Sequence, residues 1–490
     1  MVKLFKKIPF FLFLLVLFFC LHGWLENYGF ISFREILVPG IKIFTSIILL
    51  TGLLFLITRN FIFAALLSGF ISTWYLFFGA IHDWVKSISF LNLIKSYPVI
   101  ITVLVLLTLA WIIFLRYKKK LYLRLVLYLN LLLLIYCLID VFSLLKTGLV
   151  KQTGSNIDRV AFDSSKVYQK PDVYLLLFDG YPGFASLKDS FNFGNEKLND
   201  YFNTHQFEVL PVFSNYYLTY FSMSSIFNMQ YVQNDYTAMQ LTQKDFQKRG
   251  VEINRAAVFP VFRSMGYSIE NVSIFEIDDK PPVSVENSFL LAHGILLTDK
   301  ILHNRLKRDL GDRLGKYIPF WKNSDFYQHD LDNKTAESLL LKTVASVKHN
   351  PKFVYAHFMM PHGPYYYDSL GNKNQFEKIG NYTLWADKDL FISYLKYIND
   401  RIIKMTDSII SHDPDAVIII MGDHGFRDFR FKGDDYTPCF DNLCALRSRD
   451  NKHLLSKKKW SNVNLFRYIF NCEFGQNMPY LADSSIAQHY

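Results

Sequence analysis

Cysteine is scarce in this chain: its 490 residues include five cysteines, and no two of them form a CxxC pair. The spacing of a zinc ribbon is therefore absent. Cys20 and Cys137 lie in apolar segments, where inert packing is expected. Cys439 and Cys444 stand five positions apart, a spacing that fits either a local disulfide or two free thiols. The chain also contains no internal repeat and no low-complexity tract.

Charged residues are few as well, at 20% of the chain, whereas hydrophobic residues reach 51%, which is high for a wholly soluble protein. The apolar excess lies mainly before residue 147. Five apolar stretches there are each close to the ~20 residues that cross a bilayer. They are about Ile8–Trp24, Ile41–Thr58, Phe61–Ile81, Tyr97–Leu115 and Leu121–Ile139. We therefore expect an integral membrane protein with an α-helical membrane domain of five transmembrane helices over residues 1–146.

The first stretch also has the basic start and apolar core of a signal peptide. It lacks a small-residue cleavage site and four further stretches follow it, so an uncleaved first span is expected.

Basic residues lie at alternate ends of these stretches and predict their orientation. Three lysines precede the first stretch, and five basic residues lie between the fourth and the fifth or just inside the fifth, at Arg116, Lys118, Lys119, Lys120 and Arg124. By the positive-inside rule the N-terminus is cytoplasmic. Five crossings then place the rest of the chain on the outer, periplasmic side of a cell (inner) membrane. Much of the net charge of +10 comes from this inside-facing cluster, so no nucleic-acid partner is expected.

The chain after the membrane domain alternates between strand-like and helical patterns. Residues 147–170 are polar and are typical of a linker, and residues 171–490 form the expected second domain. The expected strands are Val173–Phe178, Tyr267–Phe275, Phe353–Met359 and Val417–Met421. Expected helices include Phe259–Met265, a helix from Thr219 to about Tyr231, and an amphipathic helix from Phe391 to Ile409. This alternation predicts an α/β domain with a largely parallel sheet flanked by helices. Residues 276–340 are assigned no role.

Three of the apolar strands lead into residues that can bind a metal. The first ends at Asp179, the third leads to His362, and the last ends at Asp423-His424. Open α/β sheets bind their ligands at the carboxyl ends of such strands. Two carboxylates and an imidazole suit zinc, and manganese is also possible. The structural alternatives are an Asp-Gly turn after the first strand and a helix cap after the last.

A hydroxyl-rich segment, residues 214–225, lies where a helix is expected to begin. A hydroxyl at a helix N-terminus faces unpaired amide donors and the positive end of the helix dipole. This environment suits a nucleophile that attacks a phosphate or sulfate ester. The alternative is an ordinary N-cap serine or threonine.

The motifs FDGY, HGP and MGDHG, the last followed by Arg427, occur in an order that resembles the alkaline phosphatase–sulfatase superfamily. Apolar spans followed by an outer catalytic domain resemble the membrane phosphoethanolamine transferases and lipoteichoic-acid synthases. Thr219 with Ser222 three residues later is similar to the nucleophile motif of the transferases. The resemblance implies an alkaline-phosphatase-like fold. It also implies one divalent metal held by Asp179, Thr219, Asp423 and His424.

The same resemblance implies Thr219 as the nucleophile, and His362 in contact with the transferred group or the leaving oxygen. His357 is expected to have a structural role. Several features depart from the family pattern. Asp179 stands where the transferases commonly have Glu, and Phe426 stands where Glu often follows the DHG. The C/S-x-P-x-R motif of true sulfatases is missing near residue 219.

The leading expectation is a membrane enzyme that transfers a phospho-headgroup, of phosphoethanolamine or phosphoglycerol type. The donor is a membrane lipid, the acceptor is a lipid or glycan, and the intermediate is a covalent ester of Thr219. A hydrolase of sulfuric or phosphoric esters on an exported glycan or lipid shares the first half-reaction and is the second reading. A non-catalytic membrane-anchored binding protein on the same fold is the third.

Overall fold

The computed structural model describes residues 5, 7–27, 33–88, 96–152, 162–232, 241, 243–283, 295–298, 300–314, 328–346, 350–375, 386–427, 437–448 and 459–487. The chain divides into two compact units. The first, here called the helical unit, contains residues 1–155 and 286–325. The second, called the α/β unit, contains residues 156–285 and 326–490. The expected second domain, 171–490, is thus interrupted by a segment that belongs to the helical unit. Part of the expected linker, residues 153–161, lies outside the described residues, and its first six residues, 147–152, belong to the helix Tyr122–Gln152 of the helical unit.

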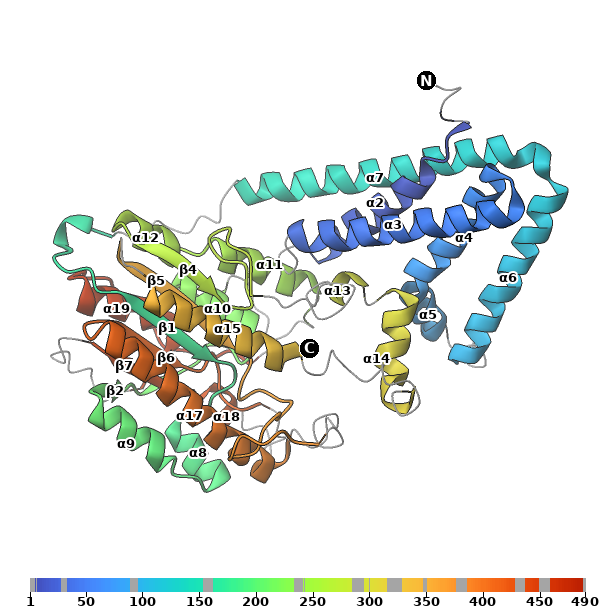
Figure 1. Cartoon of the computed structure of the whole chain (residues 1–490). Helices are drawn as coiled ribbons and strands as arrows, with labels where there is room; N and C mark the ends of the chain where they lie inside the picture. Colours follow the sequence, from blue (N-terminus) through green and yellow to red (C-terminus); the bar gives the residue numbers. More distant parts are fainter. Residues whose placement is uncertain are drawn as a thin grey trace. The chain divides into compact units, whose positions relative to one another are not determined.

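The helical unit contains long apolar helices. Three of its described helices are long and apolar enough to cross a membrane, or four if one bent pair forms a single span. The bent pair is α4 and α5, with an angle of 54° between them. The helices are α2 (Phe11–Glu26), α3 (Phe33–Thr58), α4 (Phe61–Leu76), α5 (Phe78–Ser87), α6 (Tyr97–Tyr117) and α7 (Tyr122–Gln152) (Figure 1). Because α2 has only 16 residues, it spans about 24 Å.

Helices α2 and α7 pack in parallel. Near the start of α2, the Asn130 side chain of α7 accepts a hydrogen bond from Phe11 N and donates to the carbonyls of Phe5 and Ile8. Near its end, His22 Nδ1 lies 3.3 Å from the Asp140 carboxylate. Asn130 is fully buried, and the backbone groups that it satisfies would otherwise be costly in an apolar environment.

The segment from residues 286–325 contributes two short helices to the helical unit, α13 (Ile295–Thr298) and α14 (Leu302–Leu314). Two glycines allow its close approach. A Cβ on Gly79 would lie 2.7 Å from Lys300 Cα, and a Cβ on Gly23 would lie 2.0 Å from Leu297 Cδ1. Gly79 N also donates to Lys300 O at 2.7 Å. Part of the region that the sequence left unassigned is therefore a docking segment for the membrane helices.

The α/β unit is built on a six-stranded sheet with the order β2-β7-β6-β1-β5-β4. The four strands β6, β1, β5 and β4 are parallel neighbours, whereas β7 is antiparallel to both β6 and β2. The strands are β1 (Val173–Phe178), β2 (Phe207–Val209), β4 (Ser268–Val272), β5 (Lys352–Phe358), β6 (Val417–Met421) and β7 (Cys444–Arg447). The predicted α/β domain with a largely parallel sheet is confirmed. A separate pair joins β3 (Val212–Phe213) to β8 (Trp460–Ser461).

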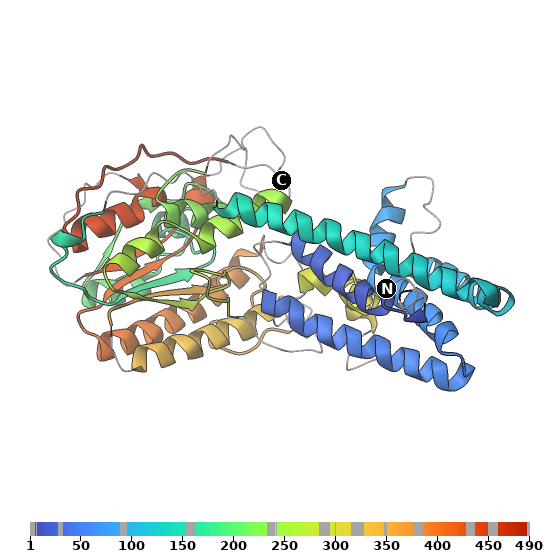
Figure 2. The ribbon, with the colours of Figure 1, turned by 90° about the horizontal axis from the view of Figure 1, so that it is seen from above.

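Helices cover both faces of this sheet (Figures 1 and 2). Val173, Leu175 and Leu177 of β1 pack with one set of helices, and Tyr174, Leu176 and Phe178 pack with the other. The first set is α10 (Thr219–Asn228), α11 (Gln243–Asn254), α12 (Val258–Ser264) and α19 (Leu465–Glu473). The second is α8 (Phe184–Phe191), α9 (Glu196–Thr204), α15 (Gln328–Ala345) and α17 (Lys388–His412). Because both faces are buried, the central strands are continuous apolar runs.

Candidate metal centre and nucleophile

The sheet register brings the predicted site residues together. In the parallel ladder, Leu177 of β1 pairs with His357 of β5 on one side and with Met421 of β6 on the other. The three strands therefore end at the same edge of the sheet. Asp179 follows β1, and Asp423 follows β6 after one glycine. This edge is where an open α/β sheet forms its ligand site.

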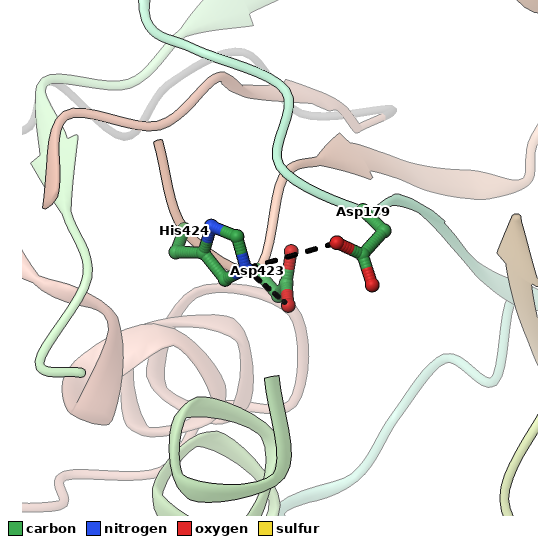
Figure 3. A group of neighbouring side chains, drawn as sticks. All are labelled: Asp179, Asp423 and His424. Atoms are coloured by element: carbon green, nitrogen blue, oxygen red, sulfur yellow. Dashed lines mark ion pairs between the residues drawn. The ribbon is translucent and has the colours of Figure 1, made fainter. Parts of the chain in front are cut away.

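Asp179, Asp423 and His424 form a buried cluster with one potential ligand atom from each side chain within 4.8 Å of the others. The three side chains point toward one another in Figure 3. His424 Nε2 lies 3.4 Å from Asp423 Oδ2 and 3.7 Å from Asp179 Oδ1. Among the described residues, neither of these two carboxylate oxygens has a hydrogen-bond partner. Buried carboxylate oxygens without donors are costly, so this arrangement fits a cation between them.

Thr219 adds a fourth potential ligand atom, its hydroxyl oxygen, to the cluster. Its hydroxyl donates to Asp179 Oδ2 at 3.3 Å and lies 3.4 Å from His424 Nε2. Two ligand atoms about 2.0–2.2 Å from a tetrahedral metal lie about 3.3–3.6 Å apart. Three of the separations given above, 3.3–3.4 Å, lie in this range, and the 3.7 Å between His424 Nε2 and Asp179 Oδ1 is slightly longer. The set of two carboxylates, a hydroxyl and an imidazole suits zinc or another divalent cation.

Short-range bonds hold these ligands in place. His424 Nδ1 lies 2.7 Å from Gly425 O, so the Nδ1–H donates to the carbonyl and Nε2 keeps its lone pair for the cluster. Burial lowers the pKa of His424, which favours the neutral imidazole. Gly180 N donates to Asp423 Oδ1 at 3.0 Å. Gly180 has a φ of +70°, a conformation that glycine adopts without strain.

The start of α10 is fixed to the same loop. Thr219 is the first residue of α10, and Ser222 one turn later donates to Asp423 O at 2.6 Å. The spacing of Thr219 and Ser222 therefore places one hydroxyl in the cluster and uses the other to anchor the helix. Thr219 remains half-buried whereas Ser222 is fully buried, so only the first hydroxyl is accessible to a substrate.

Sequence reasoning missed the contribution of Arg427. Its guanidinium donates to Tyr217 O at 3.0 Å and lies 3.1 Å from both His424 Nε2 and His362 Nε2. A cation three residues after His424 was the available signal, but no role was assigned to it. Residues 428–436, which follow Arg427, lie outside the described residues.

His362 lies beside the cluster rather than within it. Its backbone N–H donates to Asp179 O at 3.2 Å, its Nδ1 lies 2.7 Å from Gly363 O, and the side chain is partly exposed. The structure thus brings all five predicted residues to one edge of the sheet, with His362 and Arg427 flanking the four-atom cluster. A guanidinium and an imidazole beside an accessible hydroxyl suit an anionic group.

His357 was expected to be structural, and it lies against the cluster. It is buried, with Nε2 3.6 Å from Asp179 Oδ2 and Nδ1 2.8 Å from the Tyr355 hydroxyl. Burial raises the pKa of Tyr355 well above its usual range, so the phenol donates to Nδ1 and the Nε2–H faces Asp179. Burial alone would raise the pKa of Asp179. The hydrogen bond with His357 and the neighbouring side chains of His362, His424 and Arg427 outweigh burial and hold the pKa of Asp179 below its usual range.

One departure from the family pattern has a structural explanation, and the state of two cysteines is also defined. Phe426 packs against Phe391 and Phe191, with ring centroids 4.5 Å and 5.2 Å away, so this position stabilises the core and not the cluster. Cys439 and Cys444 are buried and both are free thiols.

No family model matches the sequence, and no curated protein matches it. Solved structures do resemble it. The C-terminal periplasmic domain of EcEptC from Escherichia coli, in complex with Zn, is 9% identical with a TM-score of 0.42, over 67% of this chain and 89% of that chain. The same domain of phosphoethanolamine transferase EptC from Campylobacter jejuni is 12% identical with a TM-score of 0.37, over 65% and 94%.

The phosphonate monoester hydrolase SpPMH from Silicibacter pomeroyi is 11% identical with a TM-score of 0.40, over 64% of this chain and 75% of that chain. The similar structures, which include sulfatases, are members of the alkaline phosphatase–sulfatase superfamily. No activity follows from so distant a likeness, so the function proposed below rests on the side chains of the site.

Proposed function

We propose that this protein is a metal-dependent membrane enzyme that transfers a phospho-headgroup from a lipid donor through a covalent ester of Thr219. One observation carries the proposal: the half-buried Thr219 hydroxyl lies 3.3–3.4 Å from two groups of a buried metal-ligand cluster, at the N-terminus of a helix. A hydroxyl needs activation to act as a nucleophile at neutral pH, and this position provides it.

Asp179, Thr219, Asp423 and His424 would hold one divalent cation, zinc in the first place and manganese as the alternative. The bound cation would lower the pKa of the Thr219 hydroxyl and offset negative charge that develops on the transferred group. Asp179 suits this role because its pKa is held low, which keeps the carboxylate ionised.

The chain's own residues then divide the reaction between them. Thr219 gives up its hydroxyl proton to solvent, its Oγ1 attacks the phosphorus of the donor, a bond forms between them, and the bond from phosphorus to the glyceryl oxygen breaks. Arg427, fixed by Tyr217 O, presents its guanidinium to the phosphoryl oxygens. His362 is partly exposed and, when protonated, supplies the proton that the departing diacylglycerol oxygen takes up. An acceptor hydroxyl on a lipid or glycan then displaces Thr219, takes the headgroup and gives its own proton to His362.

The helical unit supports a membrane location for this reaction. We propose that α2, α3, the bent pair α4–α5, α6 and α7 form five crossings of a cell (inner) membrane. The N-terminus is then cytoplasmic and the α/β unit periplasmic. The parallel packing of α2 and α7 supports this count, because an odd number of crossings in total makes the first and the last span run in the same direction.

The test is intact mass spectrometry of the purified full-length chain after incubation with zinc and phospholipid that carries an isotope-labelled headgroup. We expect a labelled adduct on Thr219 that is lost in Thr219→Ala. Thr204→Ala is the matched control, because Thr204 is an exposed threonine on α9. An adduct that persists in Thr219→Ala would refute the nucleophile. Release of the free headgroup in the presence of an acceptor lipid would identify a hydrolase instead.

A further inference from the structure

The helical unit contains a cavity of about 300 Å³ between α2, the start of α5 and the docking segment. Its lining contains both charged and apolar residues. The ionisable ones, here called the charged side, are His22, Glu26 and Lys300, and the apolar ones include Phe18, Phe77 and Leu297. None of these residues belongs to the metal cluster.

The charged side is a chain of ion pairs that joins three segments. Lys300 Nζ pairs with Glu26 Oε2, and Glu26 Oε1 lies 3.5 Å from His22 Nε2. His22 Nδ1 lies 3.3 Å from Asp140 Oδ2 of α7. The side chains of Lys300 and Glu26 are 35% and 40% exposed, so both can reach a ligand in the cavity. One lysine against two carboxylates gives a formal charge of −1 with His22 neutral, or 0 with His22 protonated.

The charged side lies at the C-terminal end of an apolar helix, α2. Glu26 is the last residue of α2, and the apolar residues of the helix precede it. Phe18 lies two turns earlier on the same helix. A membrane lipid places its polar headgroup at such a boundary and its acyl chains along the apolar part. Charged side chains in this setting indicate a functional site.

From this arrangement we infer that the cavity binds a zwitterionic phospholipid, with the phosphate on Lys300 and the ammonium on Glu26. The opposite charges of Lys300 and Glu26 lie side by side, as the phosphate and the amine do in such a headgroup. The aromatic rings of Phe18 and Phe77 add apolar contact for the glyceryl and acyl parts. An anionic headgroup such as phosphoglycerol would meet Lys300 but also Glu26, with no ammonium to offset the carboxylate, and Asp140, behind His22, adds a second negative charge nearby. The inference concerns lipid binding and does not depend on the transfer reaction.

The experiment is native mass spectrometry of the full-length chain in detergent, titrated with dioleoyl phosphatidylethanolamine or dioleoyl phosphatidylglycerol. We expect the first lipid to bind at least about 10-fold more tightly, as one unfavourable charge contact near ~1.4 kcal/mol implies. Glu26→Gln should reduce that preference about 10-fold, and Lys300→Gln should weaken both lipids. Lys120→Gln is the control, because Lys120 is an exposed lysine of the same unit that does not line the cavity.

Melting temperatures of all variants establish that they fold. Should Glu26→Gln fail to fold, Asp140→Asn removes a carboxylate without breaking the Lys300–Glu26 pair, and it should change the preference in the same direction. Equal binding of the two lipids would overturn the inference. So would a lipid preference that neither variant changes, or one that Lys120→Gln changes as much. No step of this assay requires turnover, so its failure and the failure of the proposed transfer are distinguishable.

Discussion

Replacing Arg427 by lysine should slow transfer strongly while leaving the metal in place. The guanidinium bonds to Tyr217 O and reaches the two imidazoles of His362 and His424 at 3.1 Å each. A lysine keeps the charge, but its single ammonium cannot span three partners. Losing one charge-assisted hydrogen bond costs about 1.5–3 kcal/mol, which corresponds to about a 10- to 100-fold slower rate if the bond acts on the transition state.

The affinity for zinc, unlike the transfer rate, should not fall in Arg427→Lys. In the structure the Arg427 guanidinium approaches His424 Nε2, and a metal would bind to the lone pair of this same nitrogen. Arginine and metal therefore compete for this atom, and Arg427→Lys should keep or raise the affinity for zinc. The assay pairs the rate of adduct formation on Thr219 with a zinc competition titration of the same full-length sample. A fall in zinc affinity that parallels the fall in rate would refute the reasoning, because Arg427 would then act only by holding the ligands.

Three further predictions concern the ligands, the anchor of α10 and the docking segment. Asp179→Asn should abolish stoichiometric zinc, measured by elemental analysis, and with it the rise in melting temperature that saturating zinc gives wild-type protein; a rise that persists would place the metal elsewhere. Ser222→Ala and Ser225→Ala each remove one buried hydroxyl bond to a carbonyl and should each destabilise the fold by about 1–2 kcal/mol. Only Ser222→Ala should also slow transfer, because it frees the loop that carries Asp423. Equal transfer rates in the two variants would show that the Ser222 hydrogen bond does not anchor α10 to this loop. Gly79→Ala places a Cβ against the Lys300 backbone and should cost about 1–3 kcal/mol, seen as lower thermal stability and faster proteolysis of the docking segment. Gly52→Ala is the control, because nothing lies within 4 Å of its Cβ position, and identical behaviour of the two variants would rule out the close contact.

The sequence was sufficient to predict four of the six strands of the sheet and the five residues that the structure brings together at its edge. The apolar runs of β1 and β6 each lead within two residues to a carboxylate, so strand and candidate ligand could be predicted together. The expected strands at Val173–Phe178 and Val417–Met421 have the same bounds in the structure. The amphipathic helix from Phe391 to Ile409 is confirmed within α17.

The rest depended on contacts between distant residues, which no local pattern encodes. The bend between α4 and α5 is an example. In a continuous helix Gly79 N would donate four residues back, but here it donates to Lys300 O, a residue of the docking segment. Arg427 and His357 were underestimated for a similar reason, because their roles depend on His362 and Asp179, which come close only after the sheet forms.

The division of the chain into units also determines how the protein responds to proteases. The polypeptide passes from the helical unit to the α/β unit near residue 155, returns near 285, and leaves again near 325. A single cut in the linker therefore does not free the α/β unit, because residues 286–325 still connect it covalently to a segment docked on the membrane helices. Shedding a soluble fragment would take at least two more cuts, one on each side of that segment. Such a fragment would be two peptides held together by the sheet, since β4 and β5 are hydrogen-bonded neighbours that lie on opposite sides of the excised segment.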